Sequence, residues 1–398
     1  MITVVGIGAD GWSGLREAAR AAVCAAPRVV GSARQLELLP DEVAGERCAW
    51  PTPMDALVDE LARDDGDVCV VASGDPMLHG VGATLVRRAG AGRVRVIPHP
   101  SAFALACARL GWPSADVELV SAVARPAHVI VPWLQTGRRI VTYVTGTDGA
   151  ATLARVLCER GLGPSRFVVL EQLGGPQEHV HEGTAAGWGD RTVDLLHAVA
   201  VEVAAAEGAQ IHARTPGLPD EAFATDGQLT KRHVRAVTVA ALAPGPGELL
   251  WDVGAGSGSI AIEWLRAERS ARAIAVEPRA DRAQRSADNA LALGVPHLEV
   301  TQGRAPGALT GLPTPDVIFV GGGITTAGLL DACWAALKDG GRLVANTVTL
   351  EGEQTVAAAR AAHGGTLTRI DIAHAEPVGT FTGWRAQMTV VQWSVTKP

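Results

Sequence analysis

The sequence lacks several features that would place it in a functional class at once. Its 398 residues contain no block of like charges and carry a formal net charge of −7, which argues against nonspecific binding to nucleic acid or to an anionic membrane. No uncharged apolar stretch reaches the roughly 18 residues that a membrane span needs. The chain opens on the strand-like residues 2–5 without a basic and then apolar leader, so we expect a cytoplasmic protein.

Cysteine and lysine are also scarce. The six cysteines lie far apart and form no C-x-x-C pair, so we expect free thiols in a reducing compartment and no metal site. Only three of the 35 basic residues are lysines, a bias that codon usage explains better than arginine-based recognition. Apolar residues make up 47% of the chain and charged residues 19%, which is typical of globular proteins, and the length allows two domains.

Apolar segments alternate with Ala-, Leu- and Arg-rich helical patterns along the first half. Residues 68–73, 139–144 and 166–173 are apolar segments of this kind, and residues 197–205 form a strand-like end. The alternation is typical of βα units on a largely parallel sheet. The first half is therefore predicted to be an α/β domain.

Proline and glycine interrupt this pattern at residues 216–219, and we place a domain boundary near residues 206–215. The sequence thus predicts two domains, 1–205 and 206–398. A helix is expected after the boundary, with Thr230 as its N-cap. The second domain then alternates regularly between apolar strands and helices, which predicts a doubly wound sheet with an antiparallel end.

A glycine-rich segment in the second half follows an apolar strand. In LLWDVGAGSGSIAIEW, Asp252 ends the strand, and Gly254, Gly256 and Gly258 lead into a helix that begins near Ser259. Glycines at such a place let the backbone approach a ligand and expose amides at the helix N-terminus. The D-x-G-x-G-x-G spacing resembles motif I of the Rossmann-like class I methyltransferases, which bind S-adenosylmethionine (AdoMet). The resemblance assigns Asp252, the three glycines and Ser259 to the AdoMet site.

Three later stretches support an AdoMet site. Glu277 ends the next strand about 20 residues further on, where a carboxylate can accept both ribose hydroxyls, although by itself this would also suit NAD. QGRAP at 302–306 and PDVIFVGGG at 315–323 resemble later methyltransferase motifs, which lie near the adenine and line the site. From these two stretches the resemblance assigns to the cofactor Gly303, Arg304, Ala305 and Gly321.

The chain begins with another glycine-rich loop, in which Gly6, Gly8 and Gly11 match G-x-G-x-x-G. A dinucleotide site also needs an acidic residue roughly 20 residues later. The strand expected there ends in Gly31 and Ser32 instead, so NAD would lose its ribose anchor. The first loop is therefore predicted to bind a ligand other than NAD.

Two further stretches of the first half point to that ligand. VVASGDPMLHGVGATLV at 70–86 places a polar loop at the end of a strand, and VIPHPSAFALACARLGWP follows at 96–113. With the opening glycines they resemble the tetrapyrrole (corrin and sirohaem) methyltransferases, which bind AdoMet in a cleft between two α/β subdomains. His99 stands where many of these enzymes carry glycine, and it is a candidate for lining the substrate site. The resemblance assigns to the AdoMet site Ser73, Gly74, Asp75, Ser101 and Ala102.

Both halves together, across nearly the whole chain, resemble the two-domain precorrin-6Y C5,15-methyltransferases (decarboxylating) of cobalamin (vitamin B12) biosynthesis. A tetrapyrrole-methylase half followed by a Rossmann-like half is specific to that family, and residues 216–242 resemble the start of its decarboxylating half. The resemblance implies methylation of carbon 5 by the N-terminal half, and methylation of carbon 15 with loss of CO2 from the ring C acetate by the C-terminal half. It also implies two AdoMet sites per chain, a tetrapyrrole substrate and a homo-oligomer.

The chemistry implied asks little of acid–base groups. Methyl transfer from a sulfonium is an in-line displacement that depends mainly on alignment of donor and acceptor in a dry cleft. A protein acid could assist the decarboxylation, and Asp226 and His233 are candidates by position, with capping or a solvated side chain as the alternative. Lys231, Arg232 and Arg235 are candidates for binding the substrate carboxylates, with a solvated helix face as the alternative.

Two other functions stay open at this point. The C-terminal motifs alone would fit a methyltransferase for RNA or a metabolite, but that predicts a basic groove, against which the acidic balance of the chain argues. A single-activity AdoMet methyltransferase acting on another substrate, with one half as a scaffold, is the second alternative. The intact glycine loops in both halves argue against a scaffold without deciding the question.

Overall fold

The computed structural model describes all 398 residues and divides into two compact units. The first unit comprises Met1–Ala127 and Gln135–Gln210, and the second comprises His128–Leu134 and Ile211–Pro398. The first unit ends inside residues 206–215, where the sequence predicts a boundary. The short segment from His128 to Leu134 belongs to the second unit although the chain on both sides of it belongs to the first.

The first unit opens with a five-stranded parallel sheet in the order β3-β2-β4-β1-β5. The apolar residues of β1 and β4 are buried on both faces, one face packing with Val23 of α2 and the other with Leu85 of α5. The strands are β1 (Ile2–Ile7), β2 (Arg28–Gly31), β3 (Glu46–Ala49), β4 (Val68–Ser73) and β5 (Val94–Ile97). The helices are α1 (Gly11–Gly14), α2 (Glu17–Ala25), α3 (Ala33–Glu37), α4 (Asp55–Arg63) and α5 (Val81–Ala89).

A second five-stranded sheet completes the first unit, in the order β6-β7-β10-β8-β9. Only β6 and β7 are parallel, and the other neighbours are antiparallel, so the prediction of a largely parallel sheet is wrong for this part. The local pattern of two apolar strands with a helix between them does not set whether the strands pair parallel or antiparallel. Here β10 lies between β7 and β8 and is antiparallel to both. The elements are α6 (Ala102–Leu110), β6 (Val117–Ser121), β7 (Arg139–Tyr143), α7 (Gly149–Cys158), β8 (Arg166–Glu171), β9 (His179–Thr184), α8 (Ala185–Trp188) and β10 (His197–Glu202).

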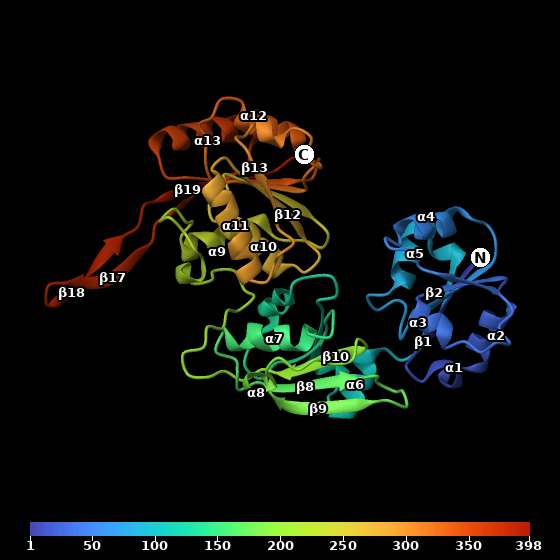
Figure 1. Cartoon of the computed structure of the whole chain (residues 1–398). Coiled ribbons are helices and arrows are strands. Elements are labelled where there is room, and N and C mark those ends of the chain that lie inside the picture. The colour runs from blue at the N-terminus through green and yellow to red at the C-terminus, as the bar shows by residue number, and fades with distance from the viewer. The chain divides into compact units, whose positions relative to one another are not determined.

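The second unit is built on a seven-stranded sheet in the order β13-β12-β11-β14-β15-β19-β16. Its first five strands are parallel and β19 is antiparallel to both neighbours, which confirms the doubly wound sheet with an antiparallel end. α9, α10 and α11 cover one face of the sheet, and α12 and α13 cover the other (Figure 1). The helices are α9 (Arg232–Leu242), α10 (Ser259–Ala267), α11 (Ala280–Ala292), α12 (Leu329–Ala336) and α13 (Leu350–His363). The strands are β11 (Leu249–Val253), β12 (Arg272–Glu277), β13 (Glu299–Gln302), β14 (Val317–Val320), β15 (Arg342–Thr347), β16 (Thr366–Ile370) and β19 (Val390–Thr396).

Two details of the second unit differ from the sequence-based expectations. The N-cap of α9 is Lys231 rather than Thr230, whose carbonyl accepts a hydrogen bond from Arg235 instead. β17 (Ala373–Val378) and β18 (Phe381–Ala386) form a separate hairpin that projects from the unit (Figure 1). No helix of the chain has the length and apolarity to cross a membrane.

Candidate functional site

A cavity of about 940 Å³ lies at the carboxyl ends of the parallel strands of the second unit. Loops meet there because β11, β12 and β14 run in the same direction, and this edge is where ligands bind in open α/β sheets. Nine residues that the sequence assigns to AdoMet line this one cavity: Asp252, Gly254, Gly256, Ser259, Glu277, Gly303, Arg304, Ala305 and Gly321. Segments far apart in the sequence thus converge on one space.

Two buried carboxylates dominate the electrostatics of the cavity. Asp252 is 1% exposed, and its Oδ2 accepts a hydrogen bond from the backbone N–H of Ala261 at 3.1 Å, while its Oδ1 has no hydrogen-bond partner. Burial, together with the nearby negative charge of Glu277, raises the pKa of Asp252 to about 7. An unpartnered buried carboxylate oxygen in a cavity is a site for a cationic or hydrogen-bond-donating ligand.

Glu277, 3% exposed, is held by backbone donors at the end of β12. Its Oε2 accepts from the N–H of Gly256 at 2.9 Å, and its Oε1 accepts from the N–H of Arg279 at 3.1 Å. A carboxylate offers about four lone-pair positions, so two remain for ligand hydroxyls. The carboxylate is therefore oriented before any ligand binds.

The three glycines of the second loop have different roles. All of them adopt positive φ, +75° at Gly254, +59° at Gly256 and +76° at Gly258, which side chains other than glycine rarely adopt. A Cβ at Gly254 would lie 2.8 Å from the backbone N of Gly322, so this glycine lets two loops touch. Gly258 packs against Ser286 of α11 and does not line the cavity, so the structure places it in loop packing rather than beside a ligand.

The three basic residues predicted to bind substrate carboxylates are separated by the structure. Lys231 lines the cavity and lies 3.7 Å from Asp220. Arg232 donates to the carbonyl of Gly217 at 2.8 Å, outside the cavity lining. Arg235 is fully buried, and its Nε donates to Oε1 of Glu263 at 2.6 Å, so the structure does not place it in the cavity lining with Lys231. Its hydrogen-bond donors are used within the fold.

The two candidate proton donors also take other roles. Asp226 accepts from Nε of Arg282 at 2.8 Å, and this contact lowers the pKa of Asp226, so the group is held as a carboxylate and is unsuited to donate a proton. His233 is exposed on α9, outside the cavity lining, with its ring centroid 5.3 Å from that of His374. The structure therefore places neither residue in the cavity lining.

In the first unit the opening glycines allow backbone segments to touch. A Cβ at Gly6 would lie 2.0 Å from the carbonyl O of Gly74 and 2.6 Å from the N of His99. A Cβ at Gly8 would lie 2.5 Å from Oδ1 of Asp10. Gly11 has a positive φ of +63° and faces Leu38. The first loop is thus packed directly against the loops that follow β4 and β5.

The other residues predicted for this site surround that contact. Ser101 caps α6 by accepting from the N–H of Ala104, and α6 begins at Ala102, while a Cβ at Gly74 would lie 3.2 Å from the Cα of Ser101. The Oγ of Ser73 instead accepts from Arg34 and Gln35 of α3. Asp75 accepts from the N–H of Met77 at 2.9 Å, which closes a local turn.

His99 lies beside the first glycine loop without the strained backbone that a replaced glycine suggests. It is absent from the residues with positive φ, and its N–H donates to the carbonyl of Gly74 at 3.3 Å. Its Nε2 lies 3.3 Å from Oδ1 of Asp10. The side chain is 14% exposed, so it contacts Asp10 and leaves only an edge for any substrate.

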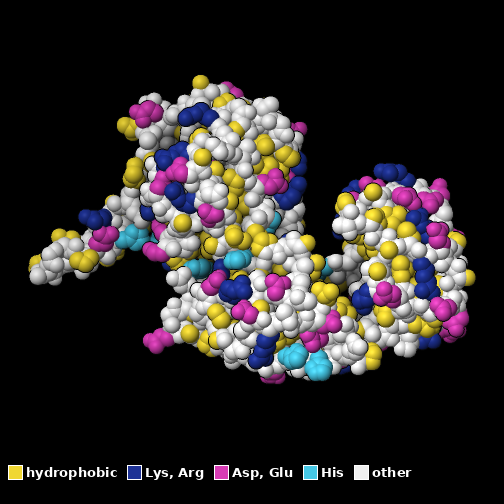
Figure 2. Space-filling model, in the orientation of Figure 1, with side chains coloured by type: hydrophobic (Ala, Val, Ile, Leu, Met, Phe, Trp, Pro, Cys, Tyr) yellow, Lys and Arg dark blue, Asp and Glu magenta, His cyan; other side chains and the backbone are white.

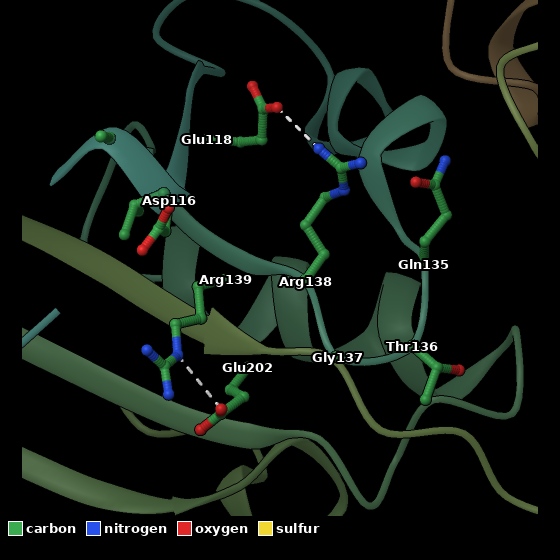
Figure 3. A pocket seen from close by; sticks show the side chains of 10 residues that line it. Asp116, Glu118, Gln135, Thr136, Gly137, Arg138, Arg139 and Glu202 are labelled. Carbon is green, nitrogen blue, oxygen red and sulfur yellow. Dashed lines mark hydrogen bonds and ion pairs between the residues drawn. The ribbon is translucent and has the colours of Figure 1, made fainter. Parts of the chain in front are cut away.

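A second cavity of about 600 Å³ lies in the first unit, and its lining includes no residue of the glycine loops. Figure 3 shows Arg138 and Arg139 in this lining, each beside a carboxylate. Arg138 pairs with Glu118 at 2.6 Å, and Arg139 pairs with Glu202 at 3.1 Å. Each arginine of this cavity thus has its own carboxylate, which leaves the pair of arginines poorly suited to bind an anionic substrate. We assign no ligand to this cavity.

Sequence reasoning missed several segments that line the cavity of the second unit. They come from the loop before α9, from the end of β15 and the loop after it, and from the base of the projecting hairpin: Gln228, Leu229, Asn346, Thr347, Val348, Thr349, Gln387 and Met388. None carries a recognisable motif. Only their position at the same sheet edge as Asp252 identifies them.

Comparisons with known proteins match two different families to the two halves of the chain, in the order that the sequence predicts. Residues 1–187 match the family model of the tetrapyrrole (corrin/porphyrin) methylases, and residues 221–397 match that of the precorrin methyltransferase domain. The chain is 47% identical over 397 residues to the precorrin-6Y C(5,15)-methyltransferase (decarboxylating) of Sinorhizobium sp, covering 100% of this chain and 96% of the relative.

Two shorter relatives match less than half of the chain each. A cobalt-precorrin-7 C(5)-methyltransferase of Salmonella typhimurium (strain LT2) is 34% identical over 46% of this chain and 89% of its own length. A probable cobalt-precorrin-6B C(15)-methyltransferase (decarboxylating) of Pyrobaculum calidifontis is 33% identical over 42% of this chain and 89% of its own length.

Proposed function

The chain belongs to the precorrin-6Y C5,15-methyltransferases (decarboxylating), and from this we propose that it binds AdoMet separately in each of its two halves. It is an AdoMet-dependent methyltransferase that acts on precorrin-6Y with decarboxylation, in cobalamin biosynthesis. The observation that supports the C-terminal site most strongly is the convergence of Asp252, Glu277 and the glycine loop on one cavity.

The residues of this cavity fit AdoMet group by group. Glu277 has free lone pairs for the ribose hydroxyls, and the unpartnered Oδ1 of Asp252 suits the cationic methionine end. Gly254 and Gly256 keep the loop free of side chains, so the donor can lie against the backbone. When bound, AdoMet supplies an electrophilic methyl group. The chain's contribution is to hold donor and acceptor aligned and to exclude water.

The division of labour follows the two halves. We assign carbon 5 methylation to residues 1–205, and carbon 15 methylation with loss of CO2 from the ring C acetate to residues 206–398. Support comes from the two shorter relatives, a C(5)- and a C(15)-methyltransferase by name, each of which matches less than half of this chain. In the first half, the loops that meet at Gly6 and Gly74 are the proposed donor site.

The substrate is a small tetrapyrrole rich in carboxylates, and three basic residues line the cavity, of which Arg282 is paired with Asp226. Lys231 lines the cavity beside its weak partner Asp220, and Arg304 lines it as an exposed side chain. Asp226 and His233 are not proposed as acids, because one is held as an ion pair and the other lies outside the lining. The macrocycle itself can act as the electron sink for decarboxylation, so the chain need only orient it.

The proposed homo-oligomer has a candidate contact surface in the hairpin of β17 and β18. The two strands pair only with each other, and Val378 is 63% exposed, Phe381 80% and Trp384 80%. Figure 2 shows hydrophobic side chains on the surface of this projecting hairpin. Exposed aromatic side chains of this size in a projecting element are typical of an interface. A Phe381→Ser/Trp384→Ser variant is expected to sediment as a smaller species than the parent, and an unchanged sedimentation coefficient would refute this surface.

Equilibrium binding of AdoMet to the intact chain and to Asp252→Ala tests the proposal. We expect two sites per chain in the parent and one in the variant, because only the C-terminal carboxylate is removed. One site in the parent would make one half a scaffold, and no binding would overturn the proposed donor sites. Glu207→Ala, an exposed carboxylate between the halves, is the control and should keep both sites.

A further inference from the structure

A loop that we call the strap, residues 217–231, forms one wall of the C-terminal cavity. Its last part, from Gly227 to Lys231, lines the cavity. The carbonyl O of Gln228 is the atom nearest to the position that a Cβ would take on Gly256, at 3.9 Å. The strap therefore lies directly over the glycine loop, on the side where a ligand would bind.

Both ends of the strap are tied to one buried ion pair. Oε2 and Oε1 of Glu263 accept from the N–H groups of Gly217 and Leu218 at 2.6 and 2.9 Å. Arg235 donates to the carbonyls of Leu218 and Thr230, so it joins the start of the strap to its end. These contacts hold the ends of the strap, but they do not connect the strap to the glycine loop.

That connection is made by Asn289 of α11, which is 3% exposed. Its Oδ1 accepts from the N–H of Ala224 at 2.9 Å, and its Nδ2 donates to the carbonyl of Ala224 at 3.0 Å. The same Nδ2 donates to the carbonyl of Ser257, in the glycine loop, at 3.0 Å. One side chain thus bonds the middle of the strap and the glycine loop at once.

We propose that Asn289 is a positioning residue for the C-terminal methyl transfer, fixing the strap relative to the glycine loop so that the donor site is formed before the ligand binds. The inference rests on the proposed C-terminal AdoMet site. Only an amide suits this place, because the side chain must accept from one peptide and donate to two. A wall that is already in place spares the ligand the ordering of the strap.

The test is Asn289→Leu in the full chain, which keeps a similar shape and loses all three hydrogen bonds. Gln284→Met is the matched control, because it makes the same amide-to-apolar change on the exposed side of α11. Transfer of labelled methyl to carbon 15 and to carbon 5 is measured against AdoMet concentration. Hydrogen exchange of residues 224–231 reports on the strap itself.

We expect Asn289→Leu to raise the KM for AdoMet at carbon 15 about tenfold, with kcat little changed, carbon 5 methylation unaffected and faster exchange in the strap. A structural role alone would lower the amount of active enzyme and leave that KM unchanged, which would overturn the proposal. Should the variant fail to fold, Ala224→Pro removes the strap N–H at an exposed position, and an unchanged KM there would overturn it equally. If methylation of carbon 15 by the parent does not depend on AdoMet, the proposed function fails, and not the role of Asn289.

Discussion

The two glycine-rich loops of this chain use the same residue type for different physical reasons. In the first loop, Gly6 and Gly8 have ordinary φ values and are needed because neighbouring atoms leave no room for a Cβ, backbone atoms at Gly6 and side-chain atoms of Asp10 and His99 at Gly8. In the second, Gly254, Gly256 and Gly258 all have positive φ, and the loop curves around a cavity. The loop that matches the dinucleotide pattern to the letter is thus the more tightly packed of the two, so the letters alone do not identify a ligand.

The largest expected effect comes from breaking the packed loop. Gly6→Ala would place a Cβ 2.0 Å from the carbonyl O of Gly74 and 2.6 Å from the N of His99. Both of these are backbone atoms, so the loops must move apart. We expect loss of carbon 5 methylation with carbon 15 methylation and CO2 release retained, measured on products by mass spectrometry and NMR. Gly92→Ala, which meets nothing within 4 Å, is the control. Retained carbon 5 methylation would show that the first loop is not a donor site.

A second difference between the halves is the burial of their ion pairs. Arg235 and Glu263 of the second unit form a fully buried pair, whereas the pairs that line the cavity of the first unit are partly exposed. Arg235→Ala would leave Glu263 as an uncompensated buried charge, so we expect it to lower the free energy of unfolding of the second unit by about 3–5 kcal/mol. Chemical denaturation, monitored by hydrogen exchange of the backbone amides of the second unit, measures this free energy. Arg235→Lys should restore part of the loss, because it keeps the charge without the planar fork. A loss below about 1 kcal/mol would mean that the pair is not buried as described.

The stability of the second unit and the AdoMet affinity of its site should both depend on pH through Asp252. Because the pKa of Asp252 in the fold is about 7, against its ordinary 3.8, the folded unit holds a proton that the unfolded chain releases. Its stability should therefore fall as the pH rises from about 4 to about 7. AdoMet is cationic and favours the carboxylate, so the Kd of the C-terminal site should rise by up to about tenfold per pH unit below 7.

Calorimetry across this pH range measures both effects. In Asp252→Asn the C-terminal site should keep no such pH dependence, because the titrating group is gone. A parent whose affinity is constant between pH 5 and 7 would contradict the assignment of Asp252 to the cationic end of the donor.

The smallest effect is expected in the cavity of the first unit. Arg138→Ala and Arg139→Ala each remove one partly exposed ion pair, which is typically worth less than about 1 kcal/mol. We expect unchanged KM values for precorrin-6Y and for AdoMet at both carbons. A tenfold rise in the KM for precorrin-6Y would identify this cavity as part of a substrate site.

Much of the fold was predictable where strands are buried on both faces. Segment 68–73 is apolar up to Ser73, and segment 249–253 is apolar apart from Asp252; the structure confirms both as central strands. Two edge strands, β3 and β9, were missed, because they are exposed and mix charged residues with apolar ones. The pairing direction in the second sheet of the first unit was wrong, since strand direction depends on distant partners rather than on the local pattern.

The same distinction between local pattern and distant partners applies to the residues of the candidate site. Motif residues such as Asp252 and Glu277 were predicted to lie together, and the structure brings them to one cavity. Asp226, His233 and Arg235 were chosen by their proximity to motif I in the sequence, and none of them lines the cavity. A polar residue near a motif can turn toward an ion pair or toward solvent as easily as toward a ligand, and the sequence carries no signal for the choice.

The sequence by itself determined the two glycine loops, the order of the two halves and the resemblance to AdoMet-dependent tetrapyrrole enzymes, because these depend on short-range residue types and spacing. Only the tertiary structure decided which charges are used up within the fold and which face a cavity. Arg235 and Asp252 are both buried ionisable residues, yet one has partners for its donors and the other keeps a free oxygen. That difference is set by residues distant in sequence that folding brings within hydrogen-bond distance.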